Sequence, residues 1–353
     1  METETRVIKS KNNEKKEGLG KFEKYLYIWI AICIIIGILL SQTIEGIGDF
    51  INSLSIGTIS IPIAICLFVM MYPAMLNLQT SELKKLGKNP KPIILTLISN
   101  WLVAPTIGTV LAAIFLPGNP ELIVAVILLA ASPCTAMVLV WGYLAEGNQE
   151  QNMITTSINT ITIIFGYVPL VALLTGIQDI PIDRILLLIS LFIFIGLPLA
   201  LGIISKKVII SRKGEEWFNT IYRPFVGKVA IFALLTTLIV LFSLNGDTLI
   251  EYPLYLLMVS IPLLLGFAIV VGYNVLVTKL FKLKYKEAII TVIIGSSSHF
   301  EIAIATATAL YGVGSIAALG TTMGLFWEIP IMLALVYLGK ILRNRNFWQN
   351  MKE

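Results

Sequence analysis

The sequence predicts an all-α polytopic membrane protein, with ten transmembrane helices arranged as a 5+5 inverted repeat. Three observations support this prediction: an apolar composition, basic residues confined to one side of a hydrophobic ladder, and helix breakers in two corresponding spans. Apolar residues occupy 57% of the 353 positions and charged residues only 13%, and the mean hydropathy is +0.87. Because about a quarter of the residues in a soluble domain are normally charged, this composition excludes an ordinary soluble protein.

Ten stretches are long enough to cross a bilayer, since a span needs about 20 apolar residues to cross roughly 30 Å of hydrocarbon. They are residues 25–41, 57–77, 92–116, 121–145, 153–176, 185–204, 224–244, 253–279, 288–311 and 316–341. The predicted domains are an N-terminal arm (1–24), a first five-helix repeat (25–176), a second five-helix repeat (185–341) and a tail (342–353). We expect the first span to be retained rather than cleaved, because no small-residue cleavage site follows it.

Basic residues set the predicted orientation. Of the 26 Lys and Arg residues, 25 fall in or within a few residues of the arm, the even-numbered connections or the tail, and only Arg184 falls on the other side. The positive-inside rule therefore places both termini in the cytoplasm and favours an even number of spans. Because these residues lie beside span ends, we attribute the net charge of +5 to orientation and attraction to anionic lipid, and expect no nucleic-acid partner. The sixth connection also places Trp217, Phe218, Ile221 and Tyr222 at helical spacing, which predicts an interfacial helix.

The fourth and ninth spans are both interrupted near their centres. The fourth carries Ala-Ser-Pro-Cys-Thr at 131–135, and the ninth carries Gly-Ser-Ser-Ser-His at 295–299. Proline removes a backbone donor, and serine hydroxyls compete for backbone groups, so both segments disfavour a continuous helix. Five spans per half make the second half enter the membrane inverted, and transporters built this way bind substrate where broken helices meet. The alternative is that these residues only kink two ordinary helices.

Two of the 21 carboxylates lie in the interior of a span, away from its ends: Glu301 in the ninth and Glu328 in the tenth. Ionisable groups at membrane depth are costly and by default indicate a functional site. Glu301 lies near the predicted midplane, where burial favours the neutral form of a carboxyl group, and this suits a proton carrier. A permanently protonated Glu301 bonded across helices is the structural alternative. For Glu328, which precedes Pro330, a structural hydrogen bond and a transport role remain equally open.

Cys134 and His299 are the other reactive side chains at the breaks. Cys134 follows Pro133, where freed amides would activate a thiol, and a soft sulfur suits a thiophilic ligand. A small apolar filler is the alternative for Cys134, and it is the expected role of Cys33 and Cys66. His299 could relay protons, contact substrate or simply satisfy a hydrogen bond. We expect no cofactor and no four-ligand metal cage, since one His, one Cys and one Glu lack the usual ligand cluster.

Three motifs resemble arsenite efflux permeases of the arsenical-resistance-3 family, within the bile acid/arsenite/riboflavin transporter superfamily. Residues 133–141, Pro-Cys-Thr-Ala-Met-Val-Leu-Val-Trp, resemble its fourth-span signature. Residues 300–305, Phe-Glu-Ile-Ala-Ile-Ala, resemble its ninth-span block, and 328–331, Glu-Ile-Pro-Ile, resemble the Glu-Val-Pro-Val of its tenth span. The chain departs from the family pattern at His299, where the family usually has Asn, and at Thr160, where it often has Asp.

The resemblance implies a secondary transporter in the plasma membrane that exports arsenite, with antimonite as a second candidate substrate, in exchange for protons. It implies that Cys134 and Glu301 are the transport residues. Joined with the breaks, it gives a predicted arsenic-binding set of Cys134, Pro133, Thr135, Ser297, Ser298 and Asn159. The predicted proton-coupling residues are Glu301 and His299, with Glu328 as a secondary candidate. The arsenic is cargo that Cys134 would bond, and not a resident metal.

Two other classes of function remain open. A sodium-coupled organic-anion importer of the same superfamily would favour several carboxylate or amide ligands at the breaks and would not need Cys134. A membrane-embedded transferase would need clustered Asp residues, but the Asp residues outside the spans are scattered: Asp49, Asp179, Asp183 and Asp247. No Gly-rich phosphate loop occurs, so an ATPase could act only as a separate, optional subunit.

Overall fold

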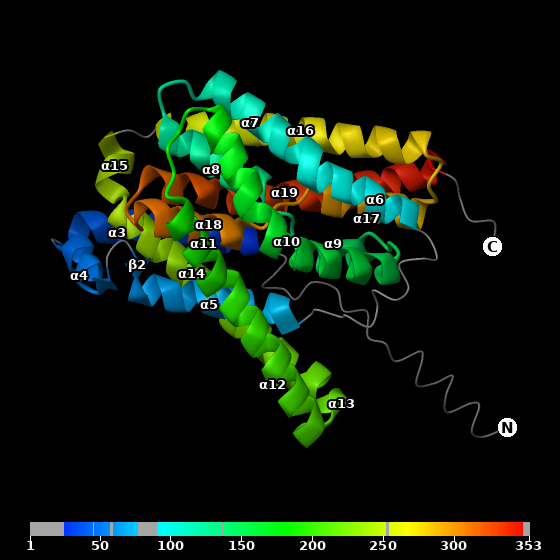
Figure 1. The fold of residues 1–353 in the computed structure, drawn as a ribbon, viewed down its shortest axis with the longest axis horizontal. Coiled ribbons are helices and arrows are strands. Elements are labelled where there is room, and N and C mark those ends of the chain that lie inside the picture. Colours follow the sequence, from blue (N-terminus) through cyan, green and yellow to red (C-terminus); the bar gives the residue numbers. More distant parts are fainter. Residues whose placement is uncertain are drawn as a thin grey trace.

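The computed structural model describes residues 25–44, 46–56, 59–76, 90–135, 137–251 and 254–348, and the predicted N-terminal arm lies outside them. Within these ranges the chain is almost entirely helical (Figure 1). The exception is a short antiparallel ribbon, in which Ser55–Ile56 (β1) pairs with Ile59–Ser60 (β2). The chain is therefore all-α, as its composition predicts for a protein that must satisfy its backbone groups within lipid.

Ten helical segments coincide with the predicted spans. In order they are α3 (Leu26–Thr43), α5 (Ile61–Leu76), α6–η2–α7 (Pro90–Ile98, Ser99–Val103, Ala104–Phe115), α8 with α9 (Pro120–Ala130, Met137–Leu144), α10 (Gln149–Ile177), α11–η3–α12 (Arg184–Leu191, Phe192–Gly196, Leu197–Lys213), α13–η4–α14 (Glu215–Trp217, Phe218–Tyr222, Arg223–Leu244), α16 (Leu254–Leu280), α17 with α18 (Tyr285–Gly295, Phe300–Tyr311) and α19 (Ile316–Asn344). Two short helices, α4 (Ile47–Ser53) and α15 (Gly246–Glu251), lie in connections. Six continuous helices in the described residues are long and apolar enough to cross a membrane, and shorter apolar helices make up most of the remaining predicted spans. Ten crossings therefore remain a prediction.

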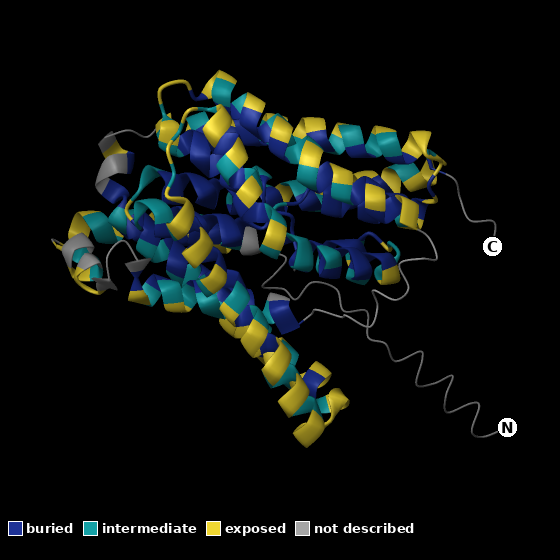
Figure 2. Ribbon diagram, in the orientation of Figure 1, coloured by how far each residue is buried: buried dark blue, intermediate teal, exposed yellow. Residues whose placement is uncertain are grey.

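The helices form two groups. In the smaller group, α14 packs on α3 and α5, and α5 packs on α12 (Figure 1). The larger group joins α6, α7, α8, α9, α10, α16, α17, α18 and α19 through mutual contacts. The groups meet where α11 and α5 contact α18 and where α3 contacts α19. Both broken spans thus belong to the larger group, which buries the interruptions among its own helices (Figure 2).

Three spans contain a π-turn, and each π-turn ends two residues before a proline. The pairs are η2 with Pro105, η3 with Pro198 and η4 with Pro224. A proline ring clashes with the carbonyl group four residues earlier, which here is the third residue of each π-turn. The wider turn moves that carbonyl away, so the helix continues through the proline. This arrangement keeps three spans continuous, in contrast to the two that break.

Two details differ from the predictions at the chain's basic connections. The aromatic residues expected on a separate interfacial helix instead begin a helix continuous with α14, and Phe218 is buried against Leu76 and Val226. Helix α19 continues to Asn344, three residues beyond the predicted tenth span. After it, Trp348 folds back and is buried, and its indole nitrogen donates to Thr278 Oγ1 at 3.1 Å.

Candidate functional site

The two predicted breaks are present, and they pair with each other. Helix α8 ends at Ala130 and α9 begins at Met137, while α17 ends at Gly295 and α18 begins at Phe300. Between them, Pro133 and Ser298 form an isolated antiparallel bridge. The His299 amide donates to the Ser132 carbonyl at 2.7 Å. Four half-helix ends therefore converge on one point inside the larger helix group, which we call the crossing.

Neighbouring helices satisfy backbone groups that the breaks release. The Cys134 carbonyl accepts from Asn159 Nδ2 of α10 at 3.2 Å, and the Gly295 carbonyl accepts from Ser99 Oγ of η2 at 2.8 Å. Ser132 Oγ donates to the Leu129 carbonyl at 2.9 Å. Irregular backbone persists at membrane depth only where protein groups surround it, and these side chains meet that requirement.

Glu328 is the most deeply enclosed carboxyl group at the crossing. It lies within α19, is 2% exposed, and accepts the hydroxyl hydrogens of Ser297 and Ser298, the latter at 2.7 Å. The Ser298 amide donates to the same carboxyl group at 3.4 Å. The tenth span is therefore tied directly to the broken ninth span. Ser297 and Ser298, which were predicted to contact substrate, donate their hydroxyls to Glu328 in this conformation.

Glu301 and His299 form a second pair at the start of α18. His299 Nδ1 lies 2.8 Å from Glu301 Oε2, and the side chains are 1% and 13% exposed. A carboxyl group in the first turn of a helix also interacts favourably with the amide end of the helix dipole. The other ring nitrogen, His299 Nε2, is buried and contacts no hydrogen-bonding partner within the described residues.

Cys134 lies in the extended segment of the fourth span, 2% exposed and outside any disulfide. Beside it, Thr135 Oγ1 is buried without a partner among the described residues, and so is Asn159 Oδ1. Asn159 therefore donates to the Cys134 carbonyl and keeps a carbonyl oxygen available for a donor. A buried thiol with these two polar groups on neighbouring residues could bond one soft atom, and the polar groups could hold the hydroxyl groups attached to it.

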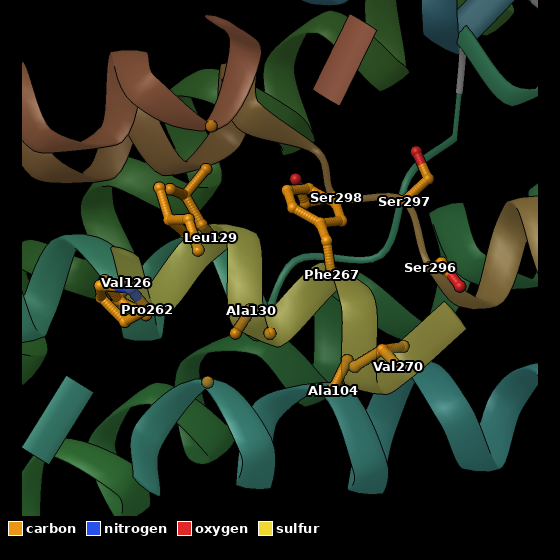
Figure 3. Close-up of a pocket in the computed structure, with 14 residues that line it drawn as sticks. Ala104, Val126, Leu129, Ala130, Pro262, Phe267, Val270, Ser296, Ser297 and Ser298 are labelled. Atoms are coloured by element: carbon orange, nitrogen blue, oxygen red, sulfur yellow. The ribbon is translucent and has the colours of Figure 1, made fainter. Parts of the chain in front are cut away.

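An apolar cavity of about 60 Å³ borders the serine segment of the ninth span (Figure 3). Its walls come from α7, α8, α16 and Gly324 of α19, and its polar edge is Ser296–Ser298. Cys134 and Glu301 are not among its lining residues. Within the described residues, no three His, Cys, Asp or Glu side chains gather as metal ligands. The chemistry available at the crossing is therefore that of one thiol, two carboxyl groups, one imidazole and several hydroxyls and amides.

Comparison with known proteins identifies the family. Residues 64–252 match the sodium bile acid symporter family. The chain is 39% identical to the transporter slr0944 of Synechocystis sp., an alignment covering 94% of this chain and 90% of that protein. It is 34% identical to the arsenical-resistance protein Acr3 of Alkaliphilus metalliredigens, covering 94% and 95% of the two chains, and 30% identical to that of Corynebacterium glutamicum, covering 92% and 90%. The chain is an Acr3-family permease.

Membership in the Acr3 family confirms the resemblance drawn from the three motifs. It makes the protein a multi-pass membrane transporter and not an enzyme, so the transferase alternative is wrong.

Sequence reasoning missed one part of the crossing, the polar contact from the third and eighth spans. Asn274 Nδ2 of α16 donates to Ser99 Oγ at 2.8 Å and to Ser296 Oγ at 3.1 Å. The side chain is 1% exposed and occupies the space that a Cβ at Gly295 would need. An asparagine inside an apolar span was the available signal, because buried amides at membrane depth need partners.

Proposed function

We propose that this Acr3-family permease exports trivalent arsenic as arsenite, with antimonite as a second substrate, in exchange for protons entering the cell. The observation that carries the proposal is the buried Cys134 thiol at the junction of two broken helices. The relatives named as arsenical-resistance proteins support it over most of both chains. The site residues and their roles below are part of the same proposal.

The chemistry of the cargo fits a single thiol. Trivalent arsenic is a neutral trihydroxide at cytoplasmic pH, so charge gives little basis for recognition. One thiol can bond arsenic reversibly: an As–S bond replaces one As–O bond, and the thiol proton leaves with the displaced hydroxide as water. Three thiols would trap the arsenic. Thr135, Asn159, Ser297 and Ser298 supply hydroxyl and amide groups around the remaining oxygens, and Pro133 keeps the segment extended.

Proton coupling is assigned to Glu301 with His299, and Glu328 joins them as a second buried carboxyl group. Glu301 exchanges its proton as substrate binds and leaves, and His299 relays it because the two side chains are in contact. Glu328 holds the serine segment, so a change in its protonation alters how Ser297 and Ser298 face the cargo. The larger helix group then rocks against the smaller one, which alternates access to the crossing.

We also propose that all ten helical segments cross the plasma membrane as two inverted five-helix repeats with both termini cytoplasmic. Equivalent spans support the repeat: α8–α9 and α17–α18 are both broken, and α10 and α19 both have 29 residues with an internal proline. Charge asymmetry supports the orientation. No ATPase subunit is required in this scheme, although one could associate.

Arsenite accumulation in sensitive cells tests the proposal. Cells expressing the wild type should accumulate less arsenite than empty-vector cells, Cys134→Ser should accumulate as much as the vector, and the control Cys33→Ser should behave like the wild type. Undiminished efflux by Cys134→Ser would remove the thiol from the mechanism. If the wild type itself gives no protection, arsenite export is wrong.

Vesicle flux separates proton coupling from the sodium-coupled alternative. An imposed pH gradient should drive arsenite transport by the wild type, and Glu301→Gln should no longer respond to the gradient. Transport that requires sodium and ignores the pH gradient would instead favour an importer of the bile acid type, in keeping with the family's description.

A further inference from the structure

The first part of α10 carries a buried polar face. Five polar side chains, all at most 5% exposed, recur within the first eleven residues of the helix: Gln151, Asn152, Thr155, Thr156 and Asn159. At 3.6 residues per turn they lie within an arc of about 140° on one side of the helix. This face packs against both half-helices α9 and α17. We call these five residues the α10 acceptor stripe.

The amide groups of the stripe have a fixed orientation. Gln151 Nε2 donates to the Glu287 carbonyl at 3.2 Å, Asn152 Nδ2 to the Val138 carbonyl at 3.1 Å, and Asn159 Nδ2 to the Cys134 carbonyl. A backbone carbonyl can only accept, so each NH₂ group must face it and each amide oxygen must point elsewhere. None of the three oxygens, Gln151 Oε1, Asn152 Oδ1 and Asn159 Oδ1, accepts a hydrogen bond from any described residue.

The threonines extend the same pattern. Thr155 and Thr156 donate their hydroxyl hydrogens to α10's own backbone, at 2.8 Å to the Gln151 carbonyl and 2.9 Å to the Asn152 carbonyl. Each of these hydroxyl oxygens keeps acceptor capacity after that donation. One buried amide oxygen without a partner also occurs away from α10, at Asn245, so a single such atom carries no argument. The alignment of five acceptors on one helix face does carry an argument, because buried acceptors normally bind water when protein donors are absent.

The length of the stripe matches the distance it would have to bridge. Gln151 and Asn159 are eight residues apart, or about 12 Å along a helix. Half of the hydrocarbon thickness is about 15 Å. The stripe begins beside the exposed Glu150 at the start of α10 and ends at the Cys134 segment. It thus runs from a surface of the protein to the crossing.

We propose that the α10 acceptor stripe holds a file of water molecules that carries protons between the Gln149 end of α10 and the crossing. The inference rests on the proton coupling proposed above and names its route. The stripe supplies acceptors only, and the waters donate to it while passing protons along the file.

Proteoliposomes loaded with a pH-sensitive dye test the route. Gln151→Leu and Asn152→Leu should slow net arsenite transport and its linked proton movement by about tenfold, the factor that about 1.4 kcal/mol on a barrier gives. Arsenite–arsenite exchange across the same vesicles should stay at the wild-type rate, because exchange moves no net protons. The matched control Asn245→Leu removes a similar buried amide off the stripe and should leave the ratio of net transport to exchange unchanged.

The outcomes are distinct. If net transport and exchange fall together, the stripe is structural and the proton route is wrong; if neither falls, the route is wrong as well. A wild type that moves arsenite without protons would overturn the proposed coupling itself. Should the leucine variants fold poorly, Thr155→Val keeps the side-chain shape, removes one acceptor, and should lower net transport but not exchange.

Discussion

Glu328 shows how a single buried carboxyl group can hold an irregular segment in place. Its carboxyl oxygens accept hydrogen bonds from the hydroxyl groups of Ser297 and Ser298 and from the backbone amide of Ser298. Inside a membrane protein these donors have no solvent to turn to, so the segment without Glu328 would keep unsatisfied groups. The same contacts make the serine segment sensitive to any change in the charge of that carboxyl group.

Glu328→Ala should therefore destabilise the folded protein, by about 3 kcal/mol or more, because each buried donor left without a partner costs about 1–3 kcal/mol. Glu328→Gln retains one acceptor oxygen and nearly the same volume, so its loss should be smaller. Thermal unfolding of the purified variants in detergent measures both. Equal melting temperatures for Ala and wild type would contradict the holding role.

The Glu146–Arg343 pair gives a prediction on pH. Arg343 Nη1 lies 2.6 Å from Glu146 Oε2, just beyond the ends of the tenth and fourth spans. The hydrogen bond from Arg343 lowers the pKa of Glu146 from its ordinary 4.5. A depressed carboxyl pKa adds stability above the unfolded-state pKa, and this stability is lost as pH falls through the folded-state value. Because both side chains are exposed, the effect should not exceed about 1 kcal/mol.

The melting temperatures of the wild type and Glu146→Gln, measured across a range of pH, test whether the Glu146–Arg343 pair stabilises the folded protein. The wild type should be slightly more stable at neutral pH, and the difference should disappear as pH falls well below 4.5. It should also shrink at high salt. A difference that grows on acidification would mean that the pair does not stabilise the folded state.

At the scale of helices, small residues set the distance between neighbours. A Cβ at Gly108 would lie 2.5 Å from Ala130 Cβ, so the backbone of α7 at Gly108 packs directly on the Ala130 methyl group of α8. The Ala130 methyl group has no flexible end that could move aside to admit a larger residue at position 108. At Gly272 of α16, by contrast, an added Cβ would meet no atom within 4 Å. Close approach through small residues is the usual way that helices pack in membranes.

Gly108→Ala should consequently destabilise the protein by about 1–3 kcal/mol, the usual cost of overpacking. Gly272→Ala is the matched control, and it should be neutral or slightly stabilising because alanine is the better helix former. Thermal unfolding of both variants measures the contrast. If Gly108→Ala and Gly272→Ala have the same melting temperature, α7 and α8 can separate more easily than their packing indicates.

Helix positions could be predicted from the sequence more completely than helix contacts. The described helices match the predicted ranges to within four residues, because bilayer thickness fixes the length of an apolar run. The exceptions flank the sixth connection, where α12 ends nine residues later and the helix continuous with α14 begins nine residues earlier than predicted. Proline and serine runs likewise predicted the breaks at Pro133 and Ser297. The contacts of Glu328 and Asn274 could not be predicted, since they depend on how each helix is rotated. Spans that are apolar on nearly every side carry little periodicity to reveal that rotation.

For the whole molecule, the division into two helix groups determines when the crossing is accessible. Cys134 is buried inside the larger group in the present conformation, whereas Cys66 on α5 of the smaller group is only partly buried. If the groups rock against each other, exposure of Cys134 must change during the transport cycle. Its reactivity toward a thiol reagent therefore reports on that motion.

A variant that retains only Cys134 should react slowly with a membrane-permeant maleimide in the absence of a gradient. An imposed pH gradient should accelerate the reaction, and arsenite should protect the thiol. Mass spectrometry of the labelled protein gives the rates, with a Cys66-only variant as the control that neither condition should affect. Labelling of Cys134 at one constant rate under all conditions would argue against the rocking motion.

After α19 the chain turns back, and Phe347 and Trp348 pack against the ends of neighbouring helices. Trp348 is seated on Tyr285 with a ring separation of 6.0 Å, and Lys279 lies 4.0 Å from the ring of Phe347. Phe347 and Trp348 therefore cover the junction where α16, α17 and α19 meet. A truncation before Phe347 would remove both aromatic side chains and loosen the packing of α16, α17 and α19 at once.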